Sequence, residues 1–236
     1  MNKKFKTFVF YYTGLPEEER RVYMQLLRGL ESHLDKCNVD SVCSAKQIEK
    51  ILDCIRLDNP IISYYNTYTM YTLNDMVVSV VFDYYLSTDK QNHINDAMLE
   101  QANKVAAYAM AKGTGARDRV KAVHEYLVQW EYDYDFKSYS YTPAGALLYG
   151  KSVCIGVALA FKLILDILGI PSITVRGEHD GEGHAWSRVY YDNTWHFFDV
   201  TFDMCGTKKG KISYRNFERS DTPEKYKTWS EFPLPK

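Results

Sequence analysis

The chain lacks any long apolar segment and carries no excess of either charge. No stretch reaches the ~18 apolar residues that a membrane-spanning helix needs. The formal net charge is -1 for 236 residues, so the protein as a whole has no field that would attract nucleic acid or an anionic membrane. We therefore expect neither nucleic acid nor a membrane among its partners.

The cysteines lack the paired spacing of a metal finger, and their number, five, is odd. They are Cys37, Cys43, Cys54, Cys154 and Cys205. At least one thiol must stay unpaired within a monomer, and a disulfide framework is not expected. For every cysteine except Cys154, the simplest interpretation is a small buried side chain or an unused thiol.

A secretion signal is also missing. The apolar run at residues 8–12 is too short for one, and no small-residue cleavage site follows it. We therefore expect a cytoplasmic protein, or a secreted one if a leader has been removed.

The composition that remains is that of a globular protein, with 46% hydrophobic and 25% charged residues. A chain of this length can bury a sizeable core. It has no internal repeat and no low-complexity tract. Periodicity and turn residues predict three parts, which are a helical or mixed N-terminal region at 1–115, a core at 116–205, and a C-terminal extension at 206–236 that packs on the core.

Helices dominate the predicted N-terminal region. The patterns predict helices at 16–36, 44–58, 95–112 and 117–130, and a strand at 76–86. Ser44 followed by Gln47 predicts a capping box at the start of the second helix. The helix at 117–130 opens the core.

Cys154 lies at the start of an apolar segment that ends at Gly169, with Pro171 beyond. This pattern predicts a buried helix with Ser152 as its cap and Cys154 in its first turn. There the positive end of the helix dipole favours thiolate over thiol, and backbone N–H groups are available to bind an oxyanion. A cysteine considered alone is nevertheless more often a core residue.

The downstream sequence favours a catalytic thiol. Residues 184–191 and 194–200 flank Asp192-Asn193, a turn pair that predicts a tight hairpin. In that register His184 opens the first strand and Asp199, in the second strand, is its diagonal neighbour on the same face. The carboxylate would orient the imidazole, and the imidazole would take the proton of the thiol.

The other histidines fit the role of base less well. His124 has no partner at metal-ligand spacing and is expected to be a surface or hydrogen-bonded residue. His179 lies in a polar run, 177–183, that is expected to be a mobile loop or lid. His196 points to the face opposite His184. A metal site built from His179, His184 and nearby acids matches no ligand spacing that we know, so we expect no metal and no cofactor.

Several short motifs occur in a specific order in the second half of the chain. They are Gly150-Lys151-Ser152-Val153-Cys154, Leu168-Gly169-Ile170-Pro171, Val175-Arg176-Gly177, Gly183-His184-Ala185-Trp186, and Trp195 through Asp199-Val200-Thr201. Together, over about residues 117–203, they resemble the core of the transglutaminase-like superfamily, the papain-related cysteine enzymes, and in particular bacterial transglutaminase-like or peptidase-type members.

The resemblance implies an α+β fold, in which a central helix bearing the cysteine packs on an antiparallel sheet and a mainly helical region precedes this core. It implies Cys154 as nucleophile, His184 as base and Asp199 as orienting acid. Trp186 and Tyr141 are candidates for contact with substrate. The side-chain oxyanion donor comes from a variable position, for which Tyr132, Tyr134 and Tyr141 are candidates.

The resemblance further implies acyl transfer on peptide or glutamine-type amides through a thioester, with hydrolysis ahead of crosslinking. The partner would be a peptide or protein substrate. Two alternatives stay open. One is a catalytically silent binding or scaffolding domain that has kept the fold. The other is acetyl transfer to small amines from a coenzyme A thioester, which uses the same three residue types.

Overall fold

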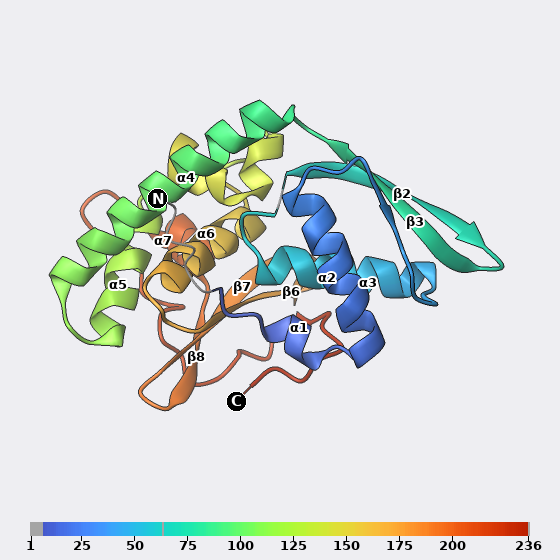
Figure 1. Cartoon of the computed structure of the whole chain (residues 1–236). Helices are drawn as coiled ribbons and strands as arrows, with labels where there is room; N and C mark the ends of the chain where they lie inside the picture. Colours follow the sequence, from blue (N-terminus) through green and yellow to red (C-terminus); the bar gives the residue numbers. More distant parts are fainter. Residues whose placement is uncertain (1–6, 63, 236) are drawn as a thin grey trace. The chain divides into compact units, whose positions relative to one another are not determined.

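The computed structural model describes residues 7–62 and 64–235. The chain forms two compact units (Figure 1). The N-terminal unit is Val9–His93, and the C-terminal unit is Ile94–Lys236 together with the N-terminal segment that ends at Phe8. This division falls inside one long helix, whereas the sequence placed a boundary at residue 115. The boundaries of independently folding domains stay a prediction.

The N-terminal unit combines helices with a small antiparallel sheet whose strand order is β1-β3-β2. Its elements are α1 (Phe10–Gly14), α2 (Glu17–Glu31), β1 (Lys36–Asn38), α3 (Ala45–Asp58), β2 (Tyr65–Leu73) and β3 (Met76–Tyr84). The capping box of Ser44 and Gln47 is confirmed at the start of α3. The apolar faces of α2 and α3 are buried, as their periodicity predicts. Strand β2 was not predicted, because its tyrosines and threonines alternate too weakly in polarity.

The C-terminal unit contains further helices, four short turns or strands, and a larger sheet. Its helices are α4 (Thr88–Lys112, which begins in the N-terminal unit), α5 (Ala116–Leu127), α6 (Cys154–Ile167) and α7 (Val200–Gly206). The turns and short strands between α5 and α6 are β4 (Glu131–Tyr132), η1 (Ser138–Tyr141), η2 (Gly145–Tyr149) and β5 (Lys151–Ser152). The sheet strands are β6 (Ser172–His179), β7 (Glu182–Tyr191), β8 (Thr194–Phe198) and β9 (Tyr226–Thr228).

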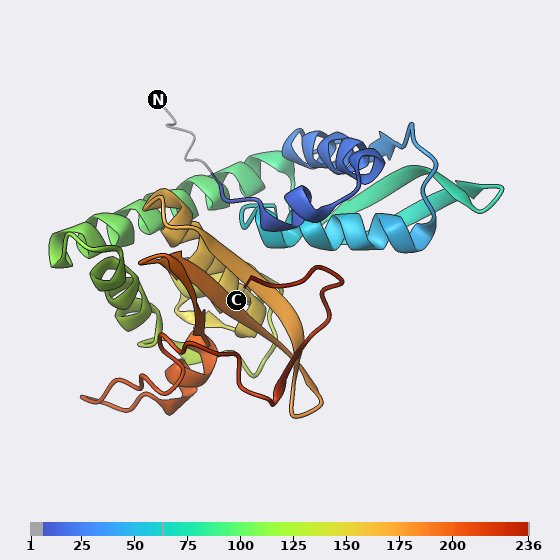
Figure 2. The same cartoon turned by 90° about the horizontal axis from the view of Figure 1, so that it is seen from below.

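These four strands form an antiparallel sheet in the order β8-β7-β6-β9 (Figure 2). Helix α6 packs on β6 and β7, and its apolar residues are buried almost all round. The fold is therefore the expected α+β type, with a cysteine-bearing helix on an antiparallel sheet. The last strand, β9, comes from the C-terminal segment and pairs with β6.

The predicted β7–β8 hairpin is confirmed in its register. Tyr191 lies opposite Thr194, and Val189 lies opposite His196. The turn residues Asp192 and Asn193 both have positive φ, as a tight primed turn requires.

Three local predictions were wrong. Residues 177–183 are not a loop, because β6 and β7 continue through them and are joined by a two-residue turn at Asp180 and Gly181, both at positive φ. Ser152 does not cap α6, because it belongs to β5 and its hydroxyl donates to the carbonyl of Ser140 at 2.9 Å. Asp199 is not in a strand, because β8 ends at Phe198 and Asp199 is the N-cap of α7.

No helix in the described part of the chain has both the length and the apolar composition needed to cross a bilayer.

Candidate active site

Cys154 is the first residue of α6 and is partly exposed, in contrast to the buried Cys37, Cys43 and Cys54. Burial raises the pKa of each of these three thiols. Burial, followed by the charge of Asp199, also raises the pKa of Cys205. Among the five cysteines, the thiol at the start of α6 is thus the one with both access to solvent and the favourable end of a helix dipole.

The start of α6 is held in place by close packing against the η1 segment. A Cβ on Gly156 would lie 2.2 Å from the carbonyl oxygen of Ser140 and 2.8 Å from that of Thr142, so only glycine fits there. The Ser152 hydroxyl bonds to the same Ser140 carbonyl. This packing fixes the backbone around Cys154, and with it the direction of the thiol.

His184, the third residue of β7, joins the thiol to a carboxylate. Its Nε2 lies 2.6 Å from Oδ2 of Asp199, and the side chain of Cys154 is near enough to raise the pKa of its ring. Because Nε2 is held by Asp199, Nδ1 is the ring nitrogen left for the thiol. The three residues predicted from the sequence are therefore brought together around one imidazole.

Asp199 is fully buried and accepts three hydrogen bonds. Besides His184, the hydroxyl of Tyr226 donates to Oδ2 at 2.8 Å, and the backbone N–H of Phe202 donates to Oδ1 at 2.9 Å. The carboxylate is thus both the cap of α7 and the partner of the imidazole. A buried carboxylate needs such donors, since an unpaired buried charge is very costly.

The electrostatics of His184 follow from this arrangement. Burial by itself lowers the pKa of the imidazole, but the hydrogen bonds and negative charges of Asp199 and Cys154 outweigh it and raise the pKa to about 9. The site therefore favours an imidazolium at neutral pH. An imidazolium beside a thiol is the arrangement that stabilises a thiolate.

Aromatic rings from α7 and β7 pack around the imidazole. The ring of Phe202 stacks on His184 at 4.5 Å between centroids, and that of Trp186 lies at 6.4 Å. Trp186 is 1% exposed and also packs on the ring of Tyr226 at 5.2 Å. Trp186 is thus positioned to shield the contact between His184 and Asp199 from water. Direct contact of Trp186 with substrate stays a prediction that this burial does not favour.

The candidate tyrosines lie on the cysteine side of the site. Burial and then the charges of Cys154, Cys205 and Tyr141 raise the pKa of Tyr132 to about 12, which places Tyr132 near the thiol. The ring of Tyr134 lies 5.0 Å from that of Tyr132. Tyr141, at the end of η1, is 38% exposed and accessible to a substrate.

Of the competing histidines, His179 shares the aromatic neighbours of His184, and its ring lies 6.1 Å from that of His184, whereas His196 and His124 have other surroundings. His179 packs in the sheet against Tyr226 at 4.6 Å and Phe202 at 4.7 Å. His196 stacks on Tyr191 at 4.1 Å. His124 is fully buried and bonds to Asp203 at 3.0 Å. Across residues 7–62 and 64–235, no three His, Cys, Asp or Glu side chains gather as a metal site.

Sequence reasoning missed Tyr226, which donates to Asp199 from the far C-terminal strand. Nothing in the local sequence around Tyr226 marks it among twenty tyrosines. Its role arises from the pairing of β9 with β6, which sets Tyr226 opposite His179. A contact of that sequence separation is visible only in the folded chain.

A family model described as transglutaminase-like superfamily matches residues 103–200. The match includes Cys154, His184 and Asp199, the three residues that the structure joins. This part of the chain is thus similar to the transglutaminase-like superfamily. This is a family of cysteine-dependent enzymes, in agreement with the resemblance noted from the motifs.

Solved structures also resemble the chain. A crystal structure of a TGase shares 20% identity with a TM-score of 0.43, over 78% of this chain and 56% of that one. The periplasmic domain of TgpA from Pseudomonas aeruginosa, bound to ethylmercury, shares 16% identity with a TM-score of 0.38, over 54% and 57%. A candidate cysteine protease from Cytophaga hutchinsonii shares 12% identity with a TM-score of 0.38, over 65% of each chain.

This chain thus spans little more than half of the length of the first two solved proteins. At such identities and TM-scores, these similarities say nothing about substrate or reaction. No curated protein matches the chain.

Proposed function

We propose that the protein is a cysteine-dependent acyl-transfer enzyme that acts on peptide or glutamine-type amides. The observation that carries this proposal is one imidazole that is hydrogen-bonded to a buried carboxylate and lies close to a partly exposed thiol. That arrangement supplies a nucleophile, a proton carrier and an orienting group, the minimum for covalent catalysis at an amide.

In the proposed reaction, the Cys154 thiolate attacks the amide carbonyl carbon. The carbonyl oxygen takes the negative charge, which the first-turn N–H groups of α6 stabilise. The His184 imidazolium gives its proton to the leaving nitrogen, the C–N bond breaks, and a thioester and a free amine or ammonia result. Water or a second amine then attacks the thioester while His184 accepts its proton, and the thiolate is released.

Asp199 keeps the imidazole in the required orientation and stabilises its charged form. Tyr132 is the best placed of the three tyrosine candidates for a side-chain oxyanion donor, because it lies near the thiol and its raised pKa keeps its proton. Tyr141 would contact the substrate from the exposed side.

We place hydrolysis ahead of crosslinking by analogy with the bacterial members that the motifs resemble. The substrate would be a peptide or protein, and the compartment that we propose is the cytoplasm.

The first experiment is the pH dependence of iodoacetamide labelling, with peptide mass spectrometry to follow each cysteine. For an ordinary thiol with a pKa of ~8.5, the labelling rate rises about 300-fold between about pH 6 and about pH 9.5. For Cys154 in the wild type we expect a change of only a few-fold, because the imidazolium already stabilises the thiolate. The ratio of rates at two pH values also cancels differences in intrinsic nucleophilicity.

In His184→Ala we expect the steep profile of an ordinary thiol at Cys154. His196→Ala is the matched control, since it removes another histidine of the same sheet and should leave the flat profile. A steep profile at Cys154 in the wild type would overturn the proposal and favour the binding-domain alternative.

The reaction itself is tested with a glutamine-containing peptide, with and without a primary amine, and Cys154→Ala as the blank. Mass spectrometry separates peptide cleavage, deamidation and amine incorporation. Turnover of an acyl thioester of coenzyme A, with no reaction of the peptide, would instead indicate acetyl transfer.

A further inference from the structure

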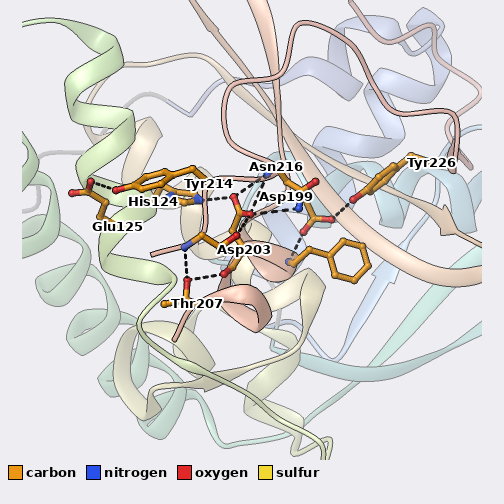
Figure 3. Close-up of polar contacts among 10 residues, drawn as sticks. His124, Glu125, Asp199, Asp203, Thr207, Tyr214, Asn216 and Tyr226 are labelled. Carbon is orange, nitrogen blue, oxygen red and sulfur yellow. Dashed lines mark hydrogen bonds and ion pairs between the residues drawn. The ribbon is translucent and has the colours of Figure 1, made fainter. Parts of the chain in front are cut away.

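A second buried His–Asp pair lies beside the candidate active site (Figure 3). Nε2 of His124, on α5, is 3.0 Å from Oδ2 of Asp203, on α7, and both side chains are 0% exposed. Asp203 follows Asp199 by one helical turn. The two buried carboxylates of α7 therefore each hold one imidazole.

Asn216 connects the two aspartates through its backbone. Its N–H donates to Oδ1 of Asp203 at 3.1 Å, and its carbonyl accepts the N–H of Asp199 at 3.0 Å. The Ser213 hydroxyl also donates to Asp203, at 2.9 Å. The segment 213–217 is thus attached to both ends of the first turn of α7, as Figure 3 shows for Asn216.

Aromatic rings pack around His124, and the hydrogen bond to Asp203 is the polar contact of its imidazole. The ring of Tyr214 stacks on it at 5.5 Å, and the edge of Phe217 meets it at 5.0 Å. The Tyr214 hydroxyl donates to Glu125 of α5. Within the described residues, Nδ1 of His124 is buried and has no hydrogen-bond partner. The imidazole therefore ties α5 to α7 through Nε2.

Helix α7 needs such ties, because it has only seven residues. A helix of that length is not stable by itself in water, so tertiary contacts must hold it. Its N-cap is Asp199, the carboxylate that meets His184. A shift of α7 would therefore move this carboxylate directly.

We propose that His124 and Asp203 form a positioning pair, which fixes α7 and the segment 213–217 so that Asp199 points at His184. Neither residue touches substrate. The inference rests on the proposed function for its catalytic meaning, but the position of Asp199 is measurable without any substrate.

The test compares His124→Gln with His124→Asn. The amide nitrogen of glutamine can reach the place of Nε2 and still donate to Asp203, whereas that of asparagine lies at the place of Nδ1 and cannot. The two variants are alike in polarity, so they separate the hydrogen bond from mere burial of a polar group. Val120→Ala, which removes packing from the same helix one turn earlier, controls for lost stability.

Two measurements are made on each variant at a temperature where circular dichroism shows it folded. One is the NMR titration of His184, and the other is the pH profile of Cys154 labelling. In His124→Asn we expect the pKa of His184 to fall from about 9 towards its ordinary value of 6.5. The ratio of labelling rates at high and low pH should rise about tenfold, within the range found for residues that act through a network. His124→Gln and Val120→Ala should keep the wild-type values.

An unchanged His184 titration in folded His124→Asn would overturn the positioning role and leave the proposed function standing. A steep wild-type labelling profile would instead remove the proposed function, while the His184 titration would still decide the positioning role. If His124→Asn does not fold, Ser213→Ala, which removes one donor to Asp203, takes its place. The same two measurements are then made on Ser213→Ala, with smaller expected changes, and an unchanged His184 titration would again overturn the positioning role.

Discussion

The buried contact between His184 and Asp199 leads to a prediction that ranks two variants by the pKa of His184. The pKa of His184 is about 9, against an ordinary value of 6.5, and its side chain is 8% exposed. At ~1.4 kcal/mol per pKa unit, the site favours the imidazolium by about 3 kcal/mol. Burial opposes the charged form of the imidazole. The hydrogen bond to Asp199 raises the pKa of His184 more than the interaction with Cys154 does.

We therefore expect Cys154→Ser to lower the pKa of His184 and Asp199→Asn to lower it further, to 6.5 or below. Asparagine is chosen because it caps a helix as well as aspartate does, so α7 should persist. The assay is an NMR titration of histidines labelled at Cε1, in which His184→Gln identifies the signal among six histidines.

The same shift predicts the dependence of stability on pH. Because the folded-state pKa of His184 is above its unfolded value, the protonated imidazole stabilises the fold fully below about pH 6.5, and this contribution is lost as the pH rises through about 9. The free energy of unfolding of the wild type should fall over this window by about 3 kcal/mol more than that of His184→Gln. The ranking of the two variants is refuted by an NMR titration in which the pKa of His184 is higher in Asp199→Asn than in Cys154→Ser.

Three further predictions concern single contacts. Tyr226→Phe removes a donor to buried Asp199 and should cost about 1.5–3 kcal/mol in urea denaturation; equal stability would contradict this. Gly156→Ala places a Cβ 2.2 Å from the carbonyl of Ser140 and should lower the melting temperature, with an overpacking cost of about 1–3 kcal/mol. Burial, opposed by a lysine, raises the pKa of Asp166 to about 6, so stability should fall as the pH rises from about 4 to about 6, and Asp166→Asn should abolish that slope.

The sequence was sufficient where local rules decide the structure. The helix that begins at Cys154 follows from a long apolar run closed by glycine. The register that carries His184 towards Asp199 follows from a two-residue turn and the period of a strand. These rules act over a few residues, so they need no knowledge of the rest of the fold.

The same rules, applied fully, would have found the β6–β7 turn. Asp180-Gly181 is a strong hairpin signal, but the surrounding charges and glycines favoured the interpretation as a loop. Asp199 was assigned to the wrong element for a different reason. Aspartate is a preferred N-cap, yet the hydrophobic strand before it has no breaker, so its end was not visible in the sequence.

The contacts that hold Asp199 were beyond such rules. Tyr226 donates to the carboxylate of Asp199, and the carbonyl of Asn216 accepts the backbone N–H of Asp199, from 27 and 17 residues along the chain. Their roles depend on how that segment returns to the sheet, and many return paths suit the same composition. Pairings of this kind are set by the whole fold, and the sequence around either residue carries no mark of them.

The dependence of Asp199 on these late residues has a consequence during synthesis of the protein. Cys154 leaves the ribosome well before Tyr226, which completes the set of donors around the carboxylate. Until that segment is made and β9 pairs with β6, Asp199 lacks the donor from Tyr226 that helps to hold it towards His184. In the proposed enzyme, the arrangement around His184 is therefore completed only after the segment that carries β9 has been made.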